Sequence, residues 1–167
     1  MPDSAAAAGP ARPDRTPGVV IAAMALASGA GGLGAFVGLY AAITLWALRS
    51  GGGPDSAWHW VEVPPYTAAV TQVCLWFNLA WLLLRAVASF GFARGSATAR
   101  VAAIAAEAAA AAVWIAMLFL HVEGRHKLGD DDPFTGVRIA AGACIVLSAV
   151  VILLLRTPSA KRWCDRR

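Results

Sequence analysis

Charged residues are scarce in this chain. They make up 14% of its 167 residues, whereas an ordinary soluble domain has about 25%. Hydrophobic residues make up 59%, and a water-soluble globule of that composition would expose large apolar patches and aggregate. The composition therefore favours a chain whose main solvent is lipid, with too few residues left over for a second folded unit.

Recognisable catalytic and metal-binding patterns are also missing. The three cysteines, at positions 74, 144 and 164, form no CxxC pair, so the sequence predicts neither a zinc site nor a disulfide framework. It contains no HExxH, no GxSxG and no phosphate-binding loop. Lys and Arg outnumber Asp and Glu by 14 to 10, but no nucleic-acid-binding motif accompanies them. We therefore expect no enzyme activity, no cofactor, no metal and no nucleic-acid partner.

What the chain does contain is long apolar stretches. A helix needs roughly 20 apolar residues to cross the hydrocarbon core of a bilayer, and a spanning segment must satisfy its backbone hydrogen bonds internally. The sequence therefore predicts an all-α fold, a four-helix transmembrane bundle. The expected spans are residues 18–48, 66–90, 99–122 and 137–155, within a domain over 18–156 that is flanked by a disordered tail (1–17) and a basic cytoplasmic tail (157–167).

Lys and Arg are unevenly distributed along these segments. Nine of them fall in the N-terminal tail, in the short turn near Ser96 and in the C-terminal tail, and only four fall in or beside the two longer loops. Because cytoplasmic loops carry the excess of basic residues, we predict that both termini are cytoplasmic in a multi-pass protein of the plasma or cytoplasmic membrane. The basic C-terminal tail is expected to contact anionic lipid headgroups.

Only two charges, Arg85 and Glu107, fall deep inside the apolar stretches, since Arg100 and Arg138 lie at the first residues of their predicted spans. Each lies eleven residues from Ser96, so two antiparallel helices joined at that turn would bring them to the same depth. Three interpretations remain open. The two residues form an ion pair that sets the register of their helices; or Arg85 snorkels to the headgroups beside a protonated Glu107; or Glu107 takes part in proton or cation movement.

Small residues recur at four-residue spacing in the first stretch. Such a ridge lets two helix backbones approach closely, and packing then replaces the hydrophobic effect that lipid does not supply. The ridge can pack inside the molecule or against a second copy, and chance alignment in an Ala-rich chain is the competing explanation. Its members are Ala30, Gly34, Gly38 and Ala42.

Other polar and aromatic residues have structural interpretations. Gln72 and Asn78 are predicted to form hydrogen bonds between helices. Trp58, Trp60 and Trp163 are predicted to act as interfacial anchors, because indole favours the headgroup region.

The layout resembles that of MARVEL-type four-span membrane proteins, which include fungal MARVEL-like proteins and the plant Casparian-strip-like group. The shared features are four spans, cytoplasmic termini, a short cytoplasmic turn and longer outer loops, over most of residues 18–155. The stretch AAEAAAAAVWIAMLFLHV is similar to the family's third helix, with Glu107 in the acidic place and Trp114 in the aromatic place. The resemblance implies a non-enzymatic, membrane-organising or trafficking-associated protein that acts by lateral helix packing, self-association and lipid contacts.

The alternative function is a small transporter or channel, or an accessory subunit of a membrane complex, with Glu107 and Arg85 in its path. Acidic residues inside membranes do mark ion paths. A proton relay, however, normally needs further titratable groups, and the sequence has none between Glu107 and His121.

Overall fold

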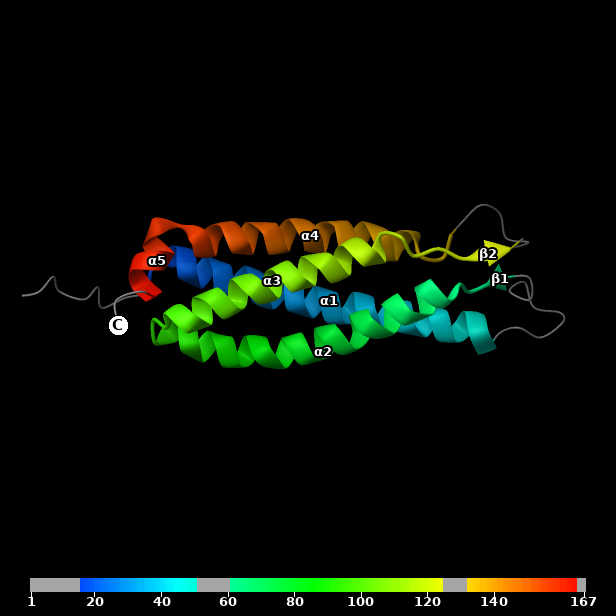
Figure 1. The fold of residues 1–167 in the computed structure, drawn as a ribbon, viewed down its shortest axis with the longest axis horizontal. Helices are drawn as coiled ribbons and strands as arrows, with labels where there is room; N and C mark the ends of the chain where they lie inside the picture. The colour runs from blue at the N-terminus through cyan, green and yellow to red at the C-terminus, as the bar shows by residue number, and fades with distance from the viewer. Residues whose placement is uncertain (1–15, 51–60, 125–131, 165–167) are drawn as a thin grey trace, which may run out of the picture.

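Four long helices form the body of the protein. The computed structural model describes residues 16–50, 61–124 and 132–164. In these ranges the long helices are α1 (Gly18–Ser50), α2 (Pro65–Ala93), α3 (Ala97–Met117) and α4 (Thr135–Arg156), which lie along a common axis (Figure 1). Each is long and apolar enough to cross a membrane. The predicted helical class and the four apolar spans are confirmed.

The helices close into a ring. Helix α1 packs against α2 and α4, and α3 packs against the same two helices from the other side. The interior between them holds two apolar clusters. One surrounds Trp114 and Phe134, and the other surrounds Val20 and Phe92. Glu107 lies on α3 between Ala103 of the second cluster and Ala110 of the first, so the charged residue sits where the two apolar cores meet.

Helix α3 is shorter than its apolar stretch. It was expected to reach residue 122 but ends at Met117. The next amides shift toward carbonyls three residues back. The Leu118 amide is shared between the Trp114 carbonyl at 3.2 Å and the Ile115 carbonyl at 3.1 Å, and the Phe119 amide bonds the Ala116 carbonyl at 3.2 Å. Such bonds tighten the last turn of a helix. The sequence stays apolar past this point because Leu120, which is not helical, is fully buried. Hydropathy alone therefore overestimated the length of the helix.

At one end of the bundle the chain forms a short antiparallel ladder. Strand β1 (Val61–Glu62) pairs with β2 (Glu123–Gly124), with Val61 opposite Gly124 and Glu62 opposite Glu123. The segment that precedes α2 is thus tied to the segment that follows α3. The sequence predicted only loops here.

At the other end the expected tail continues as a helix. Helix α5 (Pro158–Cys164) follows α4 after the single residue Thr157, whose Oγ1 accepts the amide of Ala160 at 3.4 Å. Ala160 and Cys164 are buried in the same cluster as Val20. Figure 1 shows α5 lying across this end of the bundle, beside the start of α1. Up to Cys164, the region predicted as a basic tail is therefore part of the folded domain.

Candidate functional site: a buried charge cluster

The two intramembrane charges meet inside the bundle. Helix α2 carries Arg85 and α3 carries Glu107, and the guanidinium Nη2 donates to the carboxylate Oε1 at 2.6 Å. Arg85 is 8% exposed and Glu107 is 1% exposed. The guanidinium thus lies in the interior of the bundle, not at its lipid-facing surface. A charge-assisted bond of this length is among the stronger hydrogen bonds in proteins.

A third helix completes the carboxylate's environment. The Ser148 hydroxyl, on α4, donates to Glu107 Oε2 at 2.9 Å, so both carboxylate oxygens accept a hydrogen bond. The sequence analysis did not single out Ser148. A signal was present, because Ser148 is the one residue with a hydroxyl group between positions 137 and 155. A lone serine in a transmembrane stretch is unremarkable until its neighbour across the bundle is known.

The arginine has two further neighbours. Its guanidinium carbon lies 5.2 Å from the centroid of the Trp81 ring, which is a cation–π distance. On the other side is Gly31 of α1, where an added Cβ would collide with Arg85 Nη1. The absence of a side chain at Gly31 makes the room that the guanidinium occupies. All four long helices therefore contribute to one polar site.

A small cavity adjoins this cluster. It has a volume of about 20 Å³, and its lining includes Ser28, Trp81, Arg85 and Glu107. A site needs roughly 10–15 Å³ of such volume to hold one water. The cavity is therefore large enough for a single water molecule beside the ion pair.

The small-residue ridge faces the interior. Gly38 lies against the backbone of α2, because an added Cβ would be 3.4 Å from the Cα of Leu75. At Gly34 an added Cβ would be 2.6 Å from Asn78 Oδ1 and 2.7 Å from Trp114 Cζ2. Ala30 is buried as well, and Ala42 is half-buried. Of the two packing arrangements that the sequence left open, the structure shows the one within a single molecule.

The two polar residues of α2 lie in different environments. Asn78 is buried, and its Nδ2 donates to the Cys74 carbonyl of its own helix at 2.7 Å, while its Oδ1 faces α1 at Gly34. Gln72 is exposed on the outside of the bundle. The expected hydrogen bonds between helices are thus not what the structure shows for Asn78, and Gln72 lies away from the helix interfaces. The six residues between positions 72 and 78 turn the helix by about 600°, which is about 120° short of two full turns. The two side chains therefore point to different faces of α2.

The predicted anchor Trp163 is part of the packing between α5 and the α2–α3 turn. Its Nε1 donates to the Phe92 carbonyl at 3.1 Å. Its own carbonyl oxygen would be 3.0 Å from a Cβ at Gly95, which has a φ of +68° and so adopts the left-handed conformation that glycine accepts readily. Trp58 and Trp60 lie outside the residues that the structure describes.

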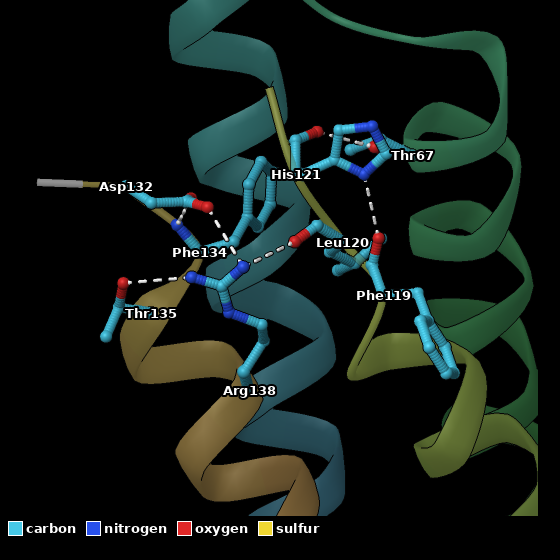
Figure 2. A network of polar contacts seen from close by, with 8 residues as sticks. All are labelled: Thr67, Phe119, Leu120, His121, Asp132, Phe134, Thr135 and Arg138. Carbon is cyan, nitrogen blue, oxygen red and sulfur yellow. Dashed lines mark hydrogen bonds and ion pairs between the residues drawn. The ribbon is translucent and has the colours of Figure 1, made fainter. Parts of the chain in front are cut away.

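A second polar network ties the helices together at the β-ladder end (Figure 2). Arg138 of α4 donates to the Leu120 carbonyl at 3.1 Å and pairs with Asp132 Oδ2 at 3.0 Å. The Thr67 hydroxyl on α2 donates to the His121 carbonyl at 2.7 Å. The irregular segment after α3 is therefore held by both α2 and α4.

His121 is the histidine among the described residues of this end. Its Nδ1 lies 2.9 Å from the Phe119 carbonyl, and its Nε2 lies 3.5 Å from Glu123 Oε1. The backbone hydrogen bond to Phe119 is the largest cause that raises the pKa of His121 above 6.5, and Glu123 raises it further. The side chain remains about half exposed, so its electrostatic contribution is screened by water.

These groups set the range of chemistry open to the site. Within residues 16–50, 61–124 and 132–164, no group of three or more His, Cys, Asp or Glu side chains has the arrangement of a metal site. The buried cluster instead offers one carboxylate whose charge is neutralised by a guanidinium and which accepts a hydrogen bond from a hydroxyl. Comparisons of the chain with protein-family models, with curated proteins and with solved structures each found no match.

Proposed function

We propose that this protein is a non-enzymatic, multi-pass membrane protein that organises its membrane, as a scaffold or trafficking-associated component, through lateral helix contacts and self-association. The observation that carries the proposal is that the polar groups inside the bundle bond to one another and leave little open space. Arg85 and Ser148 both bond the Glu107 carboxylate, and the cavity beside them has room for about one water. A MARVEL-type four-span architecture is part of the same proposal.

The outside of the bundle supports a lateral mode of action. Large apolar side chains are exposed on the long helices and would be in contact with lipid or with neighbouring membrane proteins. They include Phe36 at 67%, Trp46 at 70%, Trp76 at 68%, Leu83 at 73% and Phe90 at 71% exposure. In water such faces would cause aggregation, whereas in a bilayer they are the surface that neighbours contact.

Self-association requires a face other than the Gly34–Gly38 ridge, because that ridge is occupied within the molecule. Helix α1 also presents small residues outward: Ala25, Gly29 and Gly32 are exposed, and an added Cβ at either glycine would meet nothing within 4 Å. Ala25 and Gly29 have the four-residue spacing of close helix pairs in membranes. This outward α1 face is where we expect a second copy to pack.

Single-molecule photobleaching of the labelled protein in lipid vesicles would test the proposal. We expect oligomers for the wild type and predominantly monomers for Gly29→Leu combined with Gly32→Leu. Gly136→Leu on α4 is the matched control, because Gly136 is also exposed with open space around it. A wild type that stays monomeric at high protein density in the bilayer would refute self-association.

The orientation is also a proposal. Among the described residues, the end that carries α5 has five basic side chains, Arg94, Arg100, Arg156, Lys161 and Arg162, and no acidic one. The ladder end has Arg49 and Arg138 with Glu62, Glu123 and Asp132. This asymmetry supports a cytoplasmic α5 end in the plasma or cytoplasmic membrane. Labelling of cysteines placed at Arg94 and at Glu62 with an impermeant maleimide would report the two sides.

The second candidate function is transport, or a subunit role in a transporting complex. It is favoured by one observation, the water-sized cavity that touches both Arg85 and Glu107. Flux measurements in liposomes separate the two candidates. If Glu107→Gln stays folded and abolishes a proton or cation flux that the wild type shows, the transport function holds and the scaffold function does not account for the cluster.

A further inference from the structure

A groove opens on the outside of the bundle between α2 and α3, close to the turn that joins them. Its volume is about 290 Å³. Leu84, Val87 and Gly91 are among the α2 residues that line it, and Ala102 is among those of α3. The hydroxyl residues in its lining, Ser96 and Thr98, stand at the turn. The groove is therefore apolar along its length and polar at its mouth.

The residue sizes on the two helices explain why the groove exists. Gly91 marks the point where the helices touch, since a Cβ there would be 2.6 Å from the Ala99 Cβ. Further from the turn, α2 contributes large side chains to the lining and α3 contributes alanines, which leaves the groove open along α3. The ten residues from Gly91 back to Trp81 correspond to about 15 Å of helix, or half of a hydrocarbon core about 30 Å thick. The length of the groove along the helix axis thus matches the hydrocarbon thickness of one lipid leaflet.

Two basic residues flank, in the sequence, the turn at which the groove ends. Arg94 precedes the turn and Arg100 lies in the first turns of α3. The N-terminus of α3 points to the same place, and its first turn contains no acidic residue. A helix N-terminus and nearby guanidinium groups both stabilise a phosphate. The described part of the chain has no acidic side chain at this end of the bundle.

We propose that this groove binds one anionic phospholipid, with an acyl chain between α2 and α3 and its phosphate at Arg94, Arg100 and the N-terminus of α3. The site is complementary to such a lipid in two independent respects, the apolar groove of one leaflet's length and the basic residues at the turn. This inference goes beyond the proposed scaffold function and holds whether or not the protein self-associates.

The same pair of helices provides an internal control. A second groove, of about 320 Å³, lies between α2 and α3 near the ladder end and is lined by Ala69, Val73, Ala112 and their neighbours. The chain segments adjoining it carry Glu62 and Glu123 instead of arginines. It is therefore similar in size and apolar character but opposite in charge at its mouth, and we expect it to show no preference for anionic lipid.

Native mass spectrometry of the full chain, released from detergent micelles and titrated with lipid, would test the site. The probes are phosphatidylglycerol and phosphatidylcholine with identical acyl chains. A basic side chain near an anionic headgroup contributes a factor of about five in binding. We therefore expect phosphatidylglycerol binding to weaken about fivefold in Arg94→Gln and about 25-fold in Arg94→Gln combined with Arg100→Gln.

The groove itself is tested by filling it. Ala102→Phe, at an exposed position of α3, is expected to weaken phosphatidylglycerol binding severalfold. The matched controls are Ala112→Phe, which fills the ladder-end groove from an equally exposed alanine, and Arg156→Gln, which removes an exposed charge at the same end but on α4. Both are expected to bind phosphatidylglycerol as the wild type does. Circular dichroism and gel filtration verify folding, and Ala102→Leu is the milder variant to use if Ala102→Phe misfolds.

Several outcomes would overturn the site. Equal binding of phosphatidylglycerol and phosphatidylcholine would show that the site does not recognise the anionic headgroup. Equal effects of Arg94→Gln and Arg156→Gln would mean diffuse attraction to a basic surface, and equal effects of Ala102→Phe and Ala112→Phe would mean nonspecific annular lipid. Phosphatidylglycerol binding unchanged by groove filling, together with a protein complex in the spectra, would mean that a helix of another chain occupies the groove.

Discussion

Arg85 and Glu107 lie at the same depth on α2 and α3, eleven residues to either side of Ser96, and their side chains meet at 2.6 Å. The Ser148 hydroxyl approaches the same carboxylate from α4, and Gly31 of α1 leaves space for the guanidinium. One polar cluster therefore brings all four long helices together.

The first prediction concerns the ion pair as a unit. Arg85→Leu or Glu107→Leu alone leaves an uncompensated charge in the interior and should lower the free energy of unfolding by about 3–5 kcal/mol. The double Leu/Leu variant should recover most of that loss, because a well-packed apolar pair replaces both charges. Unfolding in mixed micelles, followed by circular dichroism, measures the cycle. Additive single effects would show that the two residues do not stabilise each other.

The second prediction isolates the hydroxyl. Ser148→Ala removes a hydrogen bond to a buried carboxylate, so it should cost about 2 kcal/mol of unfolding free energy. Ser50→Ala is the control. Its hydroxyl bonds the Trp46 carbonyl of its own exposed turn, and its loss should change stability by less than about 0.5 kcal/mol. Equal effects of the two substitutions in the same unfolding assay would argue against a role for Ser148 in the cluster.

The third prediction compares glycines of α1 that face opposite directions. Gly34→Ala should destabilise by about 1–3 kcal/mol, because its Cβ would overlap Asn78 and Trp114. Gly32→Ala has open space around it and should stabilise by about 0.4–1 kcal/mol through the reduced entropy of the unfolded chain. Thermal unfolding in detergent ranks the two variants. The reverse order would mean that α1 is rotated differently from the structure.

The fourth prediction concerns the docking of α5. In a variant in which Cys74 and Cys144 are replaced by alanine, Cys164 is the only cysteine, and its 1% exposure predicts slow reaction with a maleimide. Trp163→Phe removes the hydrogen bond to the Phe92 carbonyl. A net loss of about 1 kcal/mol would raise the labelling rate roughly fivefold. If Cys164 already reacts in the parent at the rate of an exposed thiol, α5 is not docked.

The fifth prediction concerns pH at the ladder end. The pKa of His121 is raised in the folded state, first by the Phe119 carbonyl and then by Glu123. The protonated ring thus favours the fold. This contribution is fully present below about pH 6.5, the unfolded value, and is lost as pH rises through the higher folded pKa. An NMR titration should give a His121 pKa above 6.5 that falls toward 6.5 in Glu123→Gln. A value at or below 6.5 in the parent would contradict the contacts at His121.

Some parts of this structure could be predicted from the sequence, and others could not. The equal depth of Arg85 and Glu107 follows from counting residues on either side of a short turn, because helical rise is constant. The end of α3 does not follow from hydropathy, since Leu118 and Leu120 remain apolar after the helix stops. Leu120 is buried by contacts with distant parts of the chain, and burial produces the same apolar signal whether or not the backbone is helical.

Composition and spacing along the chain were enough to predict four helices that are long and apolar enough to span a membrane, and two opposite charges at one level. These properties depend on local composition and on spacing along the chain. The rotation of the helices was needed to show that the Gly34–Gly38 ridge faces inward, that Ser148 completes the ion pair and that α5 packs against the α2–α3 turn. Each of these contacts depends on which residues of distant helices meet, and that is set by the rotation of each helix about its own axis. Mean hydropathy is the same for every such rotation, so it does not predict these contacts.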